Sequence, residues 1–381
     1  MSTPHSQRLS EAQCIVIKVG SALLVGEAGG LNRSWLESLC KDVADLRNTT
    51  AKVVIVSSGA VALGASHLGL AAGPTRLEDS QAAAAVGQIQ LAHAYQQALS
   101  EYGLGVAQVL LSLDDSESRR RYLNARGTLT TLLKHGVVPV VNENDTVATA
   151  EIRYGDNDRL AARVAEMISA DVLILLSDVD GLYSRDPQQD PNAEHIPEVR
   201  QISAAIRAMA SGRTSRLGSG GMATKLDAAA IALAAGCSMV ITRGDIPSPI
   251  EALRTGARSS WFLPDASPRR ARKQWIGGTL QPRGSLHVDA GAHQALQGGS
   301  SLLPAGVVKV DGQFERGDAV RVLFDDHEVA RGLVAYPASE AAKIAGRRSA
   351  DISELLGYSG RDEMIHRDDL VFMGSGKGES K

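Results

Sequence analysis

Cysteine, aromatic residues and long apolar runs are all scarce in this chain of 381 residues. The three cysteines, Cys14, Cys40 and Cys237, are far apart and show no Cys-x-x-Cys or Cys/His spacing. This argues against a structural zinc site or a disulfide framework and favours the reducing cytosol. Apolar runs such as 172–176 are far too short to span a bilayer, and residues 1–13 contain no apolar signal core. We therefore expect a cytoplasmic protein without a membrane segment.

A large excess of charge of one sign is also lacking, since the formal net charge is −3. Such a balance gives no general attraction to nucleic acid or to anionic membranes. The nine histidines are scattered, and none has a partner that predicts a serine or cysteine nucleophile triad. The length is sufficient for two domains.

Apolar strands alternate with helical segments over the first two thirds of the chain. Short continuous apolar runs predict buried strands, and the segments between them have helical spacing of apolar residues. The expected strands are 14–17, 53–56, 106–111, 137–141, 171–176 and 237–242. This alternation predicts an α/β fold with a mainly parallel open sheet sandwiched by helices.

Unusual polar clusters follow several of these strands. They occur at Lys18–Ser21, Ser57–Gly59, Asn142–Asp145 and Ser177–Asp178. Ligands of open α/β sheets bind beyond the carboxyl ends of the strands, so we expect these clusters to share one rim.

The segment 142–158 is the richest in carboxylates and amides, including Asp145, Asp156 and Asp158. Carboxylates packed together cost energy unless cations or a bound ligand neutralise them. The segment therefore predicts a pocket for a small polar ligand. Asp156 and Asp158 have two interpretations: acids placed favourably at a helix N-terminus, or acids that pair with lysines.

A glycine-rich turn, 218–221, runs into an expected helix that carries Lys225 in its first turn. Glycines and a helix N-terminus favour anion binding, although the P-loop spacing is absent and a flexible loop is the alternative.

Lys18 ends a buried strand and either extends to solvent or faces a ligand. Together the two lysines could bracket a phosphate. Ser58 either caps a helix or helps to form an N–H nest for a carboxylate.

The character of the sequence changes near Pro264. Residues 264–275 contain two prolines and the basic run Arg269–Lys273, which predicts a linker. Short apolar segments broken by glycine turns follow over 276–373 and predict a small β-rich domain. The tail, 374–381, is expected to be disordered. From Pro264 onward there are 16 Lys+Arg and 16 Asp+Glu, a balance that argues against RNA binding.

Six motifs, in this order, resemble the amino acid kinase family. They are Lys18-Val19-Gly20-Ser21, Ser57-Ser58-Gly59-Ala60, Asn142-Glu143-Asn144-Asp145, Gly155-Asp156-Asn157-Asp158, Ser177-Asp178 and Gly220-Gly221-Met222-Ala223-Thr224-Lys225. The Asn-Glu-Asn-Asp and Gly-Asp-Asn-Asp pair resembles the bacterial branch that acts on glutamate, whereas Asp178–Pro187 resembles many members. Residues 276 to about 371 are similar to a PUA domain, a small β-barrel. The resemblance implies a kinase domain over 1–263 and a PUA-like domain over 276–373.

This resemblance implies ATP-dependent phosphorylation of the side-chain carboxylate of L-glutamate to L-glutamyl 5-phosphate, the first step of proline synthesis. It implies a Mg²⁺ ion that bridges the phosphates, with no metal site built by the protein itself. The implied catalytic residues are Lys18, Lys225 and Asp158. The implied substrate-binding residues are Ser58, Gly59, Ala60, Asn142, Asp145 and Asn157. The implied ATP-binding residues are Lys18, Ser177, Asp178, Ser219, Gly220, Gly221, Met222, Ala223, Thr224 and Lys225.

The resemblance also implies a homo-oligomer, a dimer or tetramer, and feedback inhibition by proline at or near the glutamate site. The nucleophile would be a substrate carboxylate that is already ionised at neutral pH, which fits the absence of a histidine base. Two alternatives stay open. One is a family member that acts on aspartate or UMP, and the other is an RNA-binding protein that uses its PUA-like domain.

Overall fold

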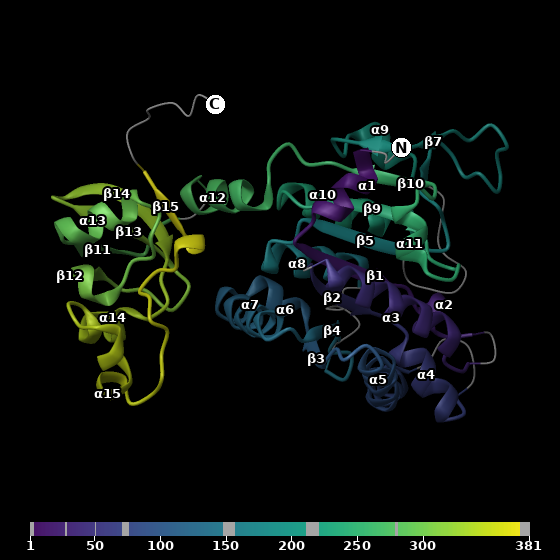
Figure 1. Cartoon of the computed structure of the whole chain (residues 1–381), viewed down its shortest axis with the longest axis horizontal. Coiled ribbons are helices and arrows are strands. Elements are labelled where there is room, and N and C mark those ends of the chain that lie inside the picture. Colours follow the sequence, from purple (N-terminus) through teal and green to yellow (C-terminus); the bar gives the residue numbers. More distant parts are fainter. Residues whose placement is uncertain are drawn as a thin grey trace. The chain divides into compact units, whose positions relative to one another are not determined.

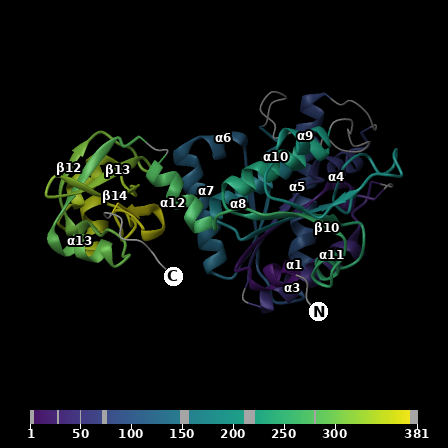
Figure 2. The same cartoon turned by 90° about the horizontal axis from the view of Figure 1, so that it is seen from above.

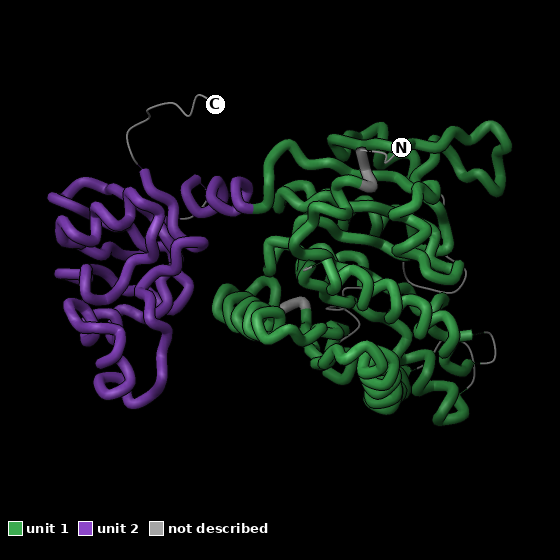
Figure 3. The backbone as a smooth tube through the Cα atoms, in the orientation of Figure 1, with its two compact units in different colours: residues 1–268 green, residues 269–381 purple. Residues whose placement is uncertain are grey.

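The computed structural model describes residues 4–26, 29–49, 51–70, 76–147, 157–210, 221–278 and 281–373. The chain forms two compact units, residues 1–268 and 269–381 (Figure 3). The predicted linker at 264–275 spans this division, and helix α12 (Pro268–Gly278) occupies much of it. The tail that we expect to be disordered, 374–381, lies outside the described residues.

An eight-stranded sheet forms the centre of the first unit (Figure 1). Its strands are β1 (Cys14–Val19), β2 (Lys52–Ser57), β3 (Val106–Leu111), β4 (Val138–Glu143), β5 (Val172–Ser177), β8 (Glu198–Val199), β9 (Ser238–Arg243) and β10 (Ser259–Phe262). Their order is β3-β4-β2-β1-β5-β9-β10-β8, and all neighbours are parallel except β9 and β10. The predicted mainly parallel α/β sheet is confirmed. The prediction lacks β8 and β10, which are too short to carry a clear periodicity.

Helices cover both faces of this sheet, with α3 and α10 on opposite sides of it in Figure 2. One face packs against α1 (Pro4–Glu11), α3 (Arg33–Asn48), α5 (Leu77–Ser100) and α11 (Pro249–Arg254). The other packs against α7 (Arg119–Lys134), α8 (Asn157–Ile168) and α10 (Met222–Ala234). The unit also contains α2 (Ser21–Leu24), α4 (Ala60–His67), α6 (Leu113–Glu117) and α9 (Ala204–Ala208). Within the described ranges, no helix has the length and apolar character needed to cross a membrane.

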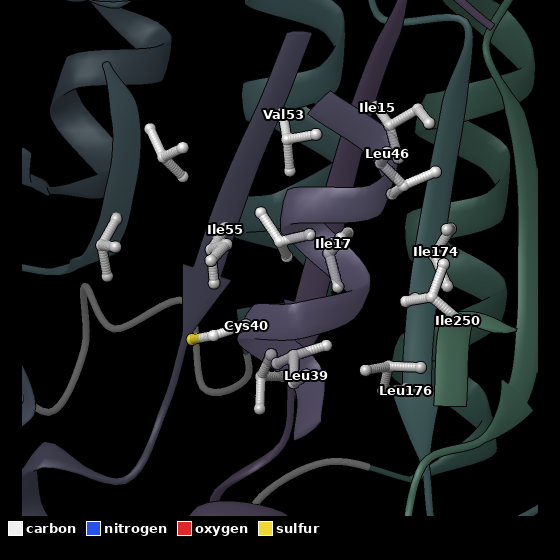
Figure 4. Packing of buried hydrophobic residues seen from close by; sticks show 14 of the residues in the cluster. Ile15, Ile17, Leu39, Cys40, Leu46, Val53, Ile55, Ile174, Leu176 and Ile250 are labelled. Atoms are coloured by element: carbon white, nitrogen blue, oxygen red, sulfur yellow. The ribbon is translucent and has the colours of Figure 1, made fainter. Parts of the chain in front are cut away.

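The alternation of side chains along β1 determines the face of the sheet on which Lys18 lies. Ile15 and Ile17 lie in the core beneath α3, with Ile15 beside Leu46 (Figure 4), whereas Val16 lies in the opposite core. Because successive side chains of a strand point to opposite faces, Lys18 falls on the face of Val16. That face is covered by α8 and α10, the helices that carry Asp158 and Lys225.

A two-stranded antiparallel sheet, β6 (Leu182–Tyr183) with β7 (His195–Ile196), follows β5 in the chain. Ser260 of the sheet strand β10 accepts a hydrogen bond from the amide of Leu182 and donates one to the carbonyl of Ile196. This serine side chain therefore links both strands of the small sheet to the large one.

The second unit is built on a five-stranded sheet in the order β12-β11-β13-β14-β15. Its elements are β11 (Gly284–Val288), α13 (Ala290–Gln297), η1 (Pro304–Gly306), β12 (Val307–Gly312), β13 (Ala319–Phe324), β14 (His327–Leu333), α14 (Ala338–Ile344), η2 (Ser349–Asp351), α15 (Ile352–Leu356), η3 (Arg367–Asp369) and β15 (Leu370–Phe372). Helix α12 is joined to this unit by a 2.6 Å ion pair between Arg272 and Asp369. The predicted small β-rich domain is confirmed.

Candidate active site

Two lysines share one aspartate at the carboxyl end of the sheet. The Nζ atom of Lys18 lies 2.5 Å from Oδ1 of Asp158, and that of Lys225 lies 3.0 Å from Oδ2. The Asp158 side chain is 0% exposed, and the two lysine side chains are 7% and 10% exposed. Lys18 therefore does not extend to solvent. Two lysines and one aspartate give the cluster a formal net charge of +1.

Asp158 and Lys225 both lie in the first turn of a helix that begins near Lys18. Asp158 lies in the first turn of α8, where its charge is favourable to the helix dipole. Helix α10 begins after Gly221, whose amide donates to Oγ1 of Thr224 at 3.2 Å. Lys225 ends the first turn of this helix, where a cation opposes the dipole. A buried lysine in that position has an electrostatic cost that Asp158 offsets, and the cost itself points to a role beyond packing.

A network of amides joins the ends of two strands beside this cluster. Nδ2 of Asn157 donates to the carbonyl of Ser57 at 2.6 Å and to Oδ1 of Asn142 at 3.0 Å. Nδ2 of Asn142 is buried and has no hydrogen-bond partner among the described residues. Buried polar atoms are nearly always paired, so this amide is a candidate donor to a ligand. Asn142 itself is the penultimate residue of strand β4 and is not part of a loop after the strand.

Helix α5 supports this network from below. Oγ of Ser57 lies 3.2 Å from the hydroxyl of Tyr95, and Nε2 of Gln88 donates to the carbonyl of Glu143 at 3.0 Å. Burial raises the pKa of Tyr95, so its phenol remains protonated. No motif in the sequence predicts the roles of Gln88 and Tyr95. The available signal is that Gln88 and Tyr95 are spaced to lie on the same face of an alanine-rich helix.

The turn from β2 into α4 brings the predicted substrate-binding residues to the same rim. Gly59 is the N-cap of α4 and adopts φ 94°, a left-handed conformation that favours glycine. The amide of Ser58 donates to the carbonyl of Val19 at 3.2 Å. The helix starts at Ala60 with no side-chain cap, so capping is not the role of Ser58.

The remaining predicted residues differ in how the structure places them. Ser177 is buried at the end of β5, and its hydroxyl donates to the exposed Asp178 at 3.0 Å. Met222 is buried, Ala223 is exposed, and Asp145 is half-buried. Asp156, Ser219 and Gly220 lie outside the described residues.

A cavity of about 410 Å³ lies beside the start of α10. Residues 181–187, Ala208–Ala210 and Met222 form much of its wall. The sequence motifs do not predict this cavity. The signal was the likeness of Asp178–Pro187 to many amino acid kinases. No group of three His, Cys, Asp or Glu side chains in the described part of the chain could hold a metal ion.

Comparisons with known proteins identify the family of this chain. Residues 13–243 match the amino acid kinase family and residues 284–356 match the PUA domain. The glutamate 5-kinase of Paramagnetospirillum magneticum is 58% identical over 96% of this chain and 99% of its own length. Glutamate 5-kinase 1 of Rhizobium meliloti is 56% identical, over 97% of this chain and 94% of its own length.

Among solved structures, the carbamate kinase of Giardia lamblia is 18% identical with a TM-score of 0.49, over 67% of this chain and 100% of its own length. The assignment therefore rests on the sequence matches. The resemblances predicted from the kinase motifs and from the C-terminal segment are confirmed. The chain belongs to the amino acid kinase family and, within it, to the glutamate 5-kinases that carry a PUA domain.

Proposed function

We propose that this chain transfers the γ-phosphoryl group of ATP to the side-chain carboxylate of L-glutamate, giving L-glutamyl 5-phosphate and ADP. This product starts proline synthesis. The names of the full-length relatives support the choice of acceptor. The observation that carries the proposal is the buried Lys18–Asp158–Lys225 cluster, with its formal net charge of +1.

The chemistry requires two anions to meet. A carboxylate oxygen of glutamate forms a bond to the γ-phosphorus while the bond from that phosphorus to the β,γ-bridging oxygen breaks. The acceptor is already ionised at neutral pH, so no enzyme base is needed. Positioning and neutralisation of charge on the transferring group supply most of the catalysis in such reactions. Lys18 and Lys225 supply this neutralisation, and Asp158 fixes the separation of their ammonium groups.

The glutamate side of the site is assigned to the ends of β2 and β4. Nδ2 of Asn142, which has no partner within the described ranges, supports a hydrogen bond to a substrate oxygen. The turn offers the backbone N–H groups of Gly59 and Ala60 and the hydroxyl of Ser58 to a carboxylate, while the Ser58 amide is used on Val19. Asp145 supplies negative charge for the substrate's ammonium group, and Asn157 holds Asn142 in place.

The ATP side is assigned to the cavity beside Met222. Its volume of about 410 Å³ is in the range of small-molecule sites. The nucleotide would contact Ser177 and Asp178 at the end of β5. It would also contact Ser219, Gly220, Gly221, Ala223, Thr224 and Lys225. Mg²⁺ would enter on the phosphates of ATP, because this ion usually binds substrate phosphates plus one or two carboxylates. When bound, it would neutralise phosphate charge together with the lysines.

Trapping the acyl phosphate with hydroxylamine tests the function. Purified protein with ATP, Mg²⁺ and L-glutamate should yield the γ-hydroxamate, and omission of either substrate should abolish it. Aspartate and UMP are the matched acceptors. Phosphorylation of either one in place of glutamate would show that the acceptor is wrong.

We also propose a homo-oligomer, a dimer or tetramer, and inhibition by proline at or near the glutamate site. Light scattering on a sizing column measures the oligomeric state, and competition between proline and glutamate in the hydroxamate assay measures the inhibition.

We further propose domain limits of 1–263 and 276–373 with a protease-sensitive linker at 264–275. Limited proteolysis that cut elsewhere first would contradict these limits.

A further inference from the structure

One wall of the cavity is held by residues outside every motif of the family resemblance. We propose that Ser260 of β10 and His195 of β7 form a positioning pair that fixes the wall at Gly181–Tyr183 and thereby sets the affinity for the nucleotide. The inference rests on the proposed function, because it takes the cavity as the nucleotide site.

Ser260 is the centre of this pair. Its hydroxyl oxygen is fully buried, accepts from the amide of Leu182 at 2.7 Å and donates to the carbonyl of Ile196 at 2.5 Å. Nε2 of His195 lies 3.2 Å from the same oxygen. A hydroxyl has one proton, and this one is used on Ile196. The histidine contact therefore requires that Nε2 carries a proton and donates to Ser260. Burial lowers the pKa of His195, which favours the neutral ring, and the contact with Ser260 then requires the tautomer with its proton on Nε2.

The backbone of the cavity wall at Gly181 lies very close to the side chains of Ser260 and His195. A Cβ atom at this position would lie 2.5 Å from Oγ of Ser260 and 2.6 Å from Nε2 of His195. Its φ of 151° is also unfavourable for residues with side chains. The backbone that lines the cavity is therefore in direct contact with the pair, with no side chain between them.

The other contacts of the wall are more exposed. The hydroxyl of Tyr183 donates to Asp180 at 2.9 Å and accepts from Arg258 at 3.2 Å. The side chains of Arg258 and Asp180, whose nearest charged atoms are 3.6 Å apart, are 62% and 31% exposed. Exposed charge pairs contribute little to stability. The buried hydrogen bonds of Ser260 are therefore the stronger restraint on the position of Leu182.

The test is calorimetric titration of the full chain with ADP, alongside hydroxamate kinetics. Ser260→Ala leaves the buried amide of Leu182 without an acceptor, so the Kd for ADP and the KM for ATP should rise on the order of tenfold. The kcat and the KM for glutamate should stay within about twofold, because the pair contacts none of Lys18, Asp158 and Lys225. His195→Ala should also weaken ADP binding, and His195→Gln, which keeps an N–H donor, should restore much of it.

Ser238→Ala is the matched control, since Ser238 is a buried serine of β9 for which the described residues show no side-chain hydrogen bond. Equal ADP affinity of Ser260→Ala and Ser238→Ala would overturn the proposal. A fall in kcat at unchanged ADP affinity would do the same. If Ser260→Ala fails to fold, the two His195 variants decide, because that side chain is only half-buried. Wild-type protein that bound no ADP and made no hydroxamate would refute the proposed function instead.

Discussion

Each unit of the chain contains a buried ion cluster, and the two differ in their balance of charge. In the second unit Arg272 and Asp369, 8% and 6% exposed, form a one-to-one pair that holds α12. In the first unit Lys18 and Lys225 share Asp158 at similar burial. Arg272 and Asp369 sum to a formal charge of zero, whereas Lys18, Lys225 and Asp158 sum to +1. Buried charge is costly unless an opposite charge neutralises it, so this comparison supports the proposal that the lysines of the first unit bind a phosphate.

Asp158→Asn should give the largest effect, because it removes the shared partner of both lysines. Hydroxamate formation should fall by more than about a hundredfold, and the free energy of unfolding should drop by roughly 3–5 kcal/mol. Urea titration measures the second quantity. The control is Asp227→Asn on α10, whose pair with Arg207 is about half-exposed and should contribute about 0–1 kcal/mol. Equal effects of the two variants would remove the distinction between the clusters.

Lys225→Met converts the two-to-one cluster into a one-to-one pair like that of the second unit. We expect turnover to fall on the order of a hundredfold, because one charge contact to the transferring group is lost. The free energy of unfolding should hold steady or rise, since a buried cation is removed while the pair of Lys18 with Asp158 remains. Steady-state kinetics and urea titration measure both. Undiminished turnover would exclude Lys225 from the site.

Arg272→Met should show the opposite pattern. Asp369 is then buried without its arginine, so the second unit should lose roughly 3–5 kcal/mol of stability while turnover per folded molecule is unchanged. Asp369→Leu added to this variant should recover most of the loss, because a buried pair can be replaced by apolar residues at little cost. A hundredfold loss of turnover in Arg272→Met would contradict the structural role of this pair.

Thiol labelling reports on the opening of the first unit alone and should show the smallest effect of the four experiments. All three cysteines are in the first unit and buried. Burial raises the pKa of Cys14 and of Cys40 to about 12, so folded protein should label very slowly at pH 8. Unfolded thiols lose protons at lower pH than folded ones, so stability should fall as pH rises from about 9 toward 12.

Labelling by a thiol reagent should accelerate in Asp158→Asn and stay unchanged in Arg272→Met. Rapid labelling of native wild-type protein would show that the first unit opens far more often than its packing indicates.

The predictable part of the fold and site follows from local patterns. Continuous apolar runs identify the six long strands, and the pleat assigns Lys18 to a face. The polar residues after each strand identify the rim. Ser260 illustrates what the sequence leaves undetermined, because it lies in a four-residue strand and bonds Leu182, 78 residues away. No periodicity marks a contact between such short elements. Asn142 is a second example. The sequence shows that an asparagine follows the apolar run of β4, but only packing determines that its Nδ2 atom has no partner among the described residues.

The order of the sheet has a consequence for synthesis of the chain on the ribosome. Strands β1 and β5 are neighbours, and both precede α10 and β9 in the chain. A nascent chain that ends before Met222 can therefore bring Lys18 to Asp158 as a neutral pair. The second cation arrives only when α10 emerges and docks on α8. We therefore expect the second lysine, and with it the charge proposed to bind phosphate, to join the site last, when most of the sheet is in place.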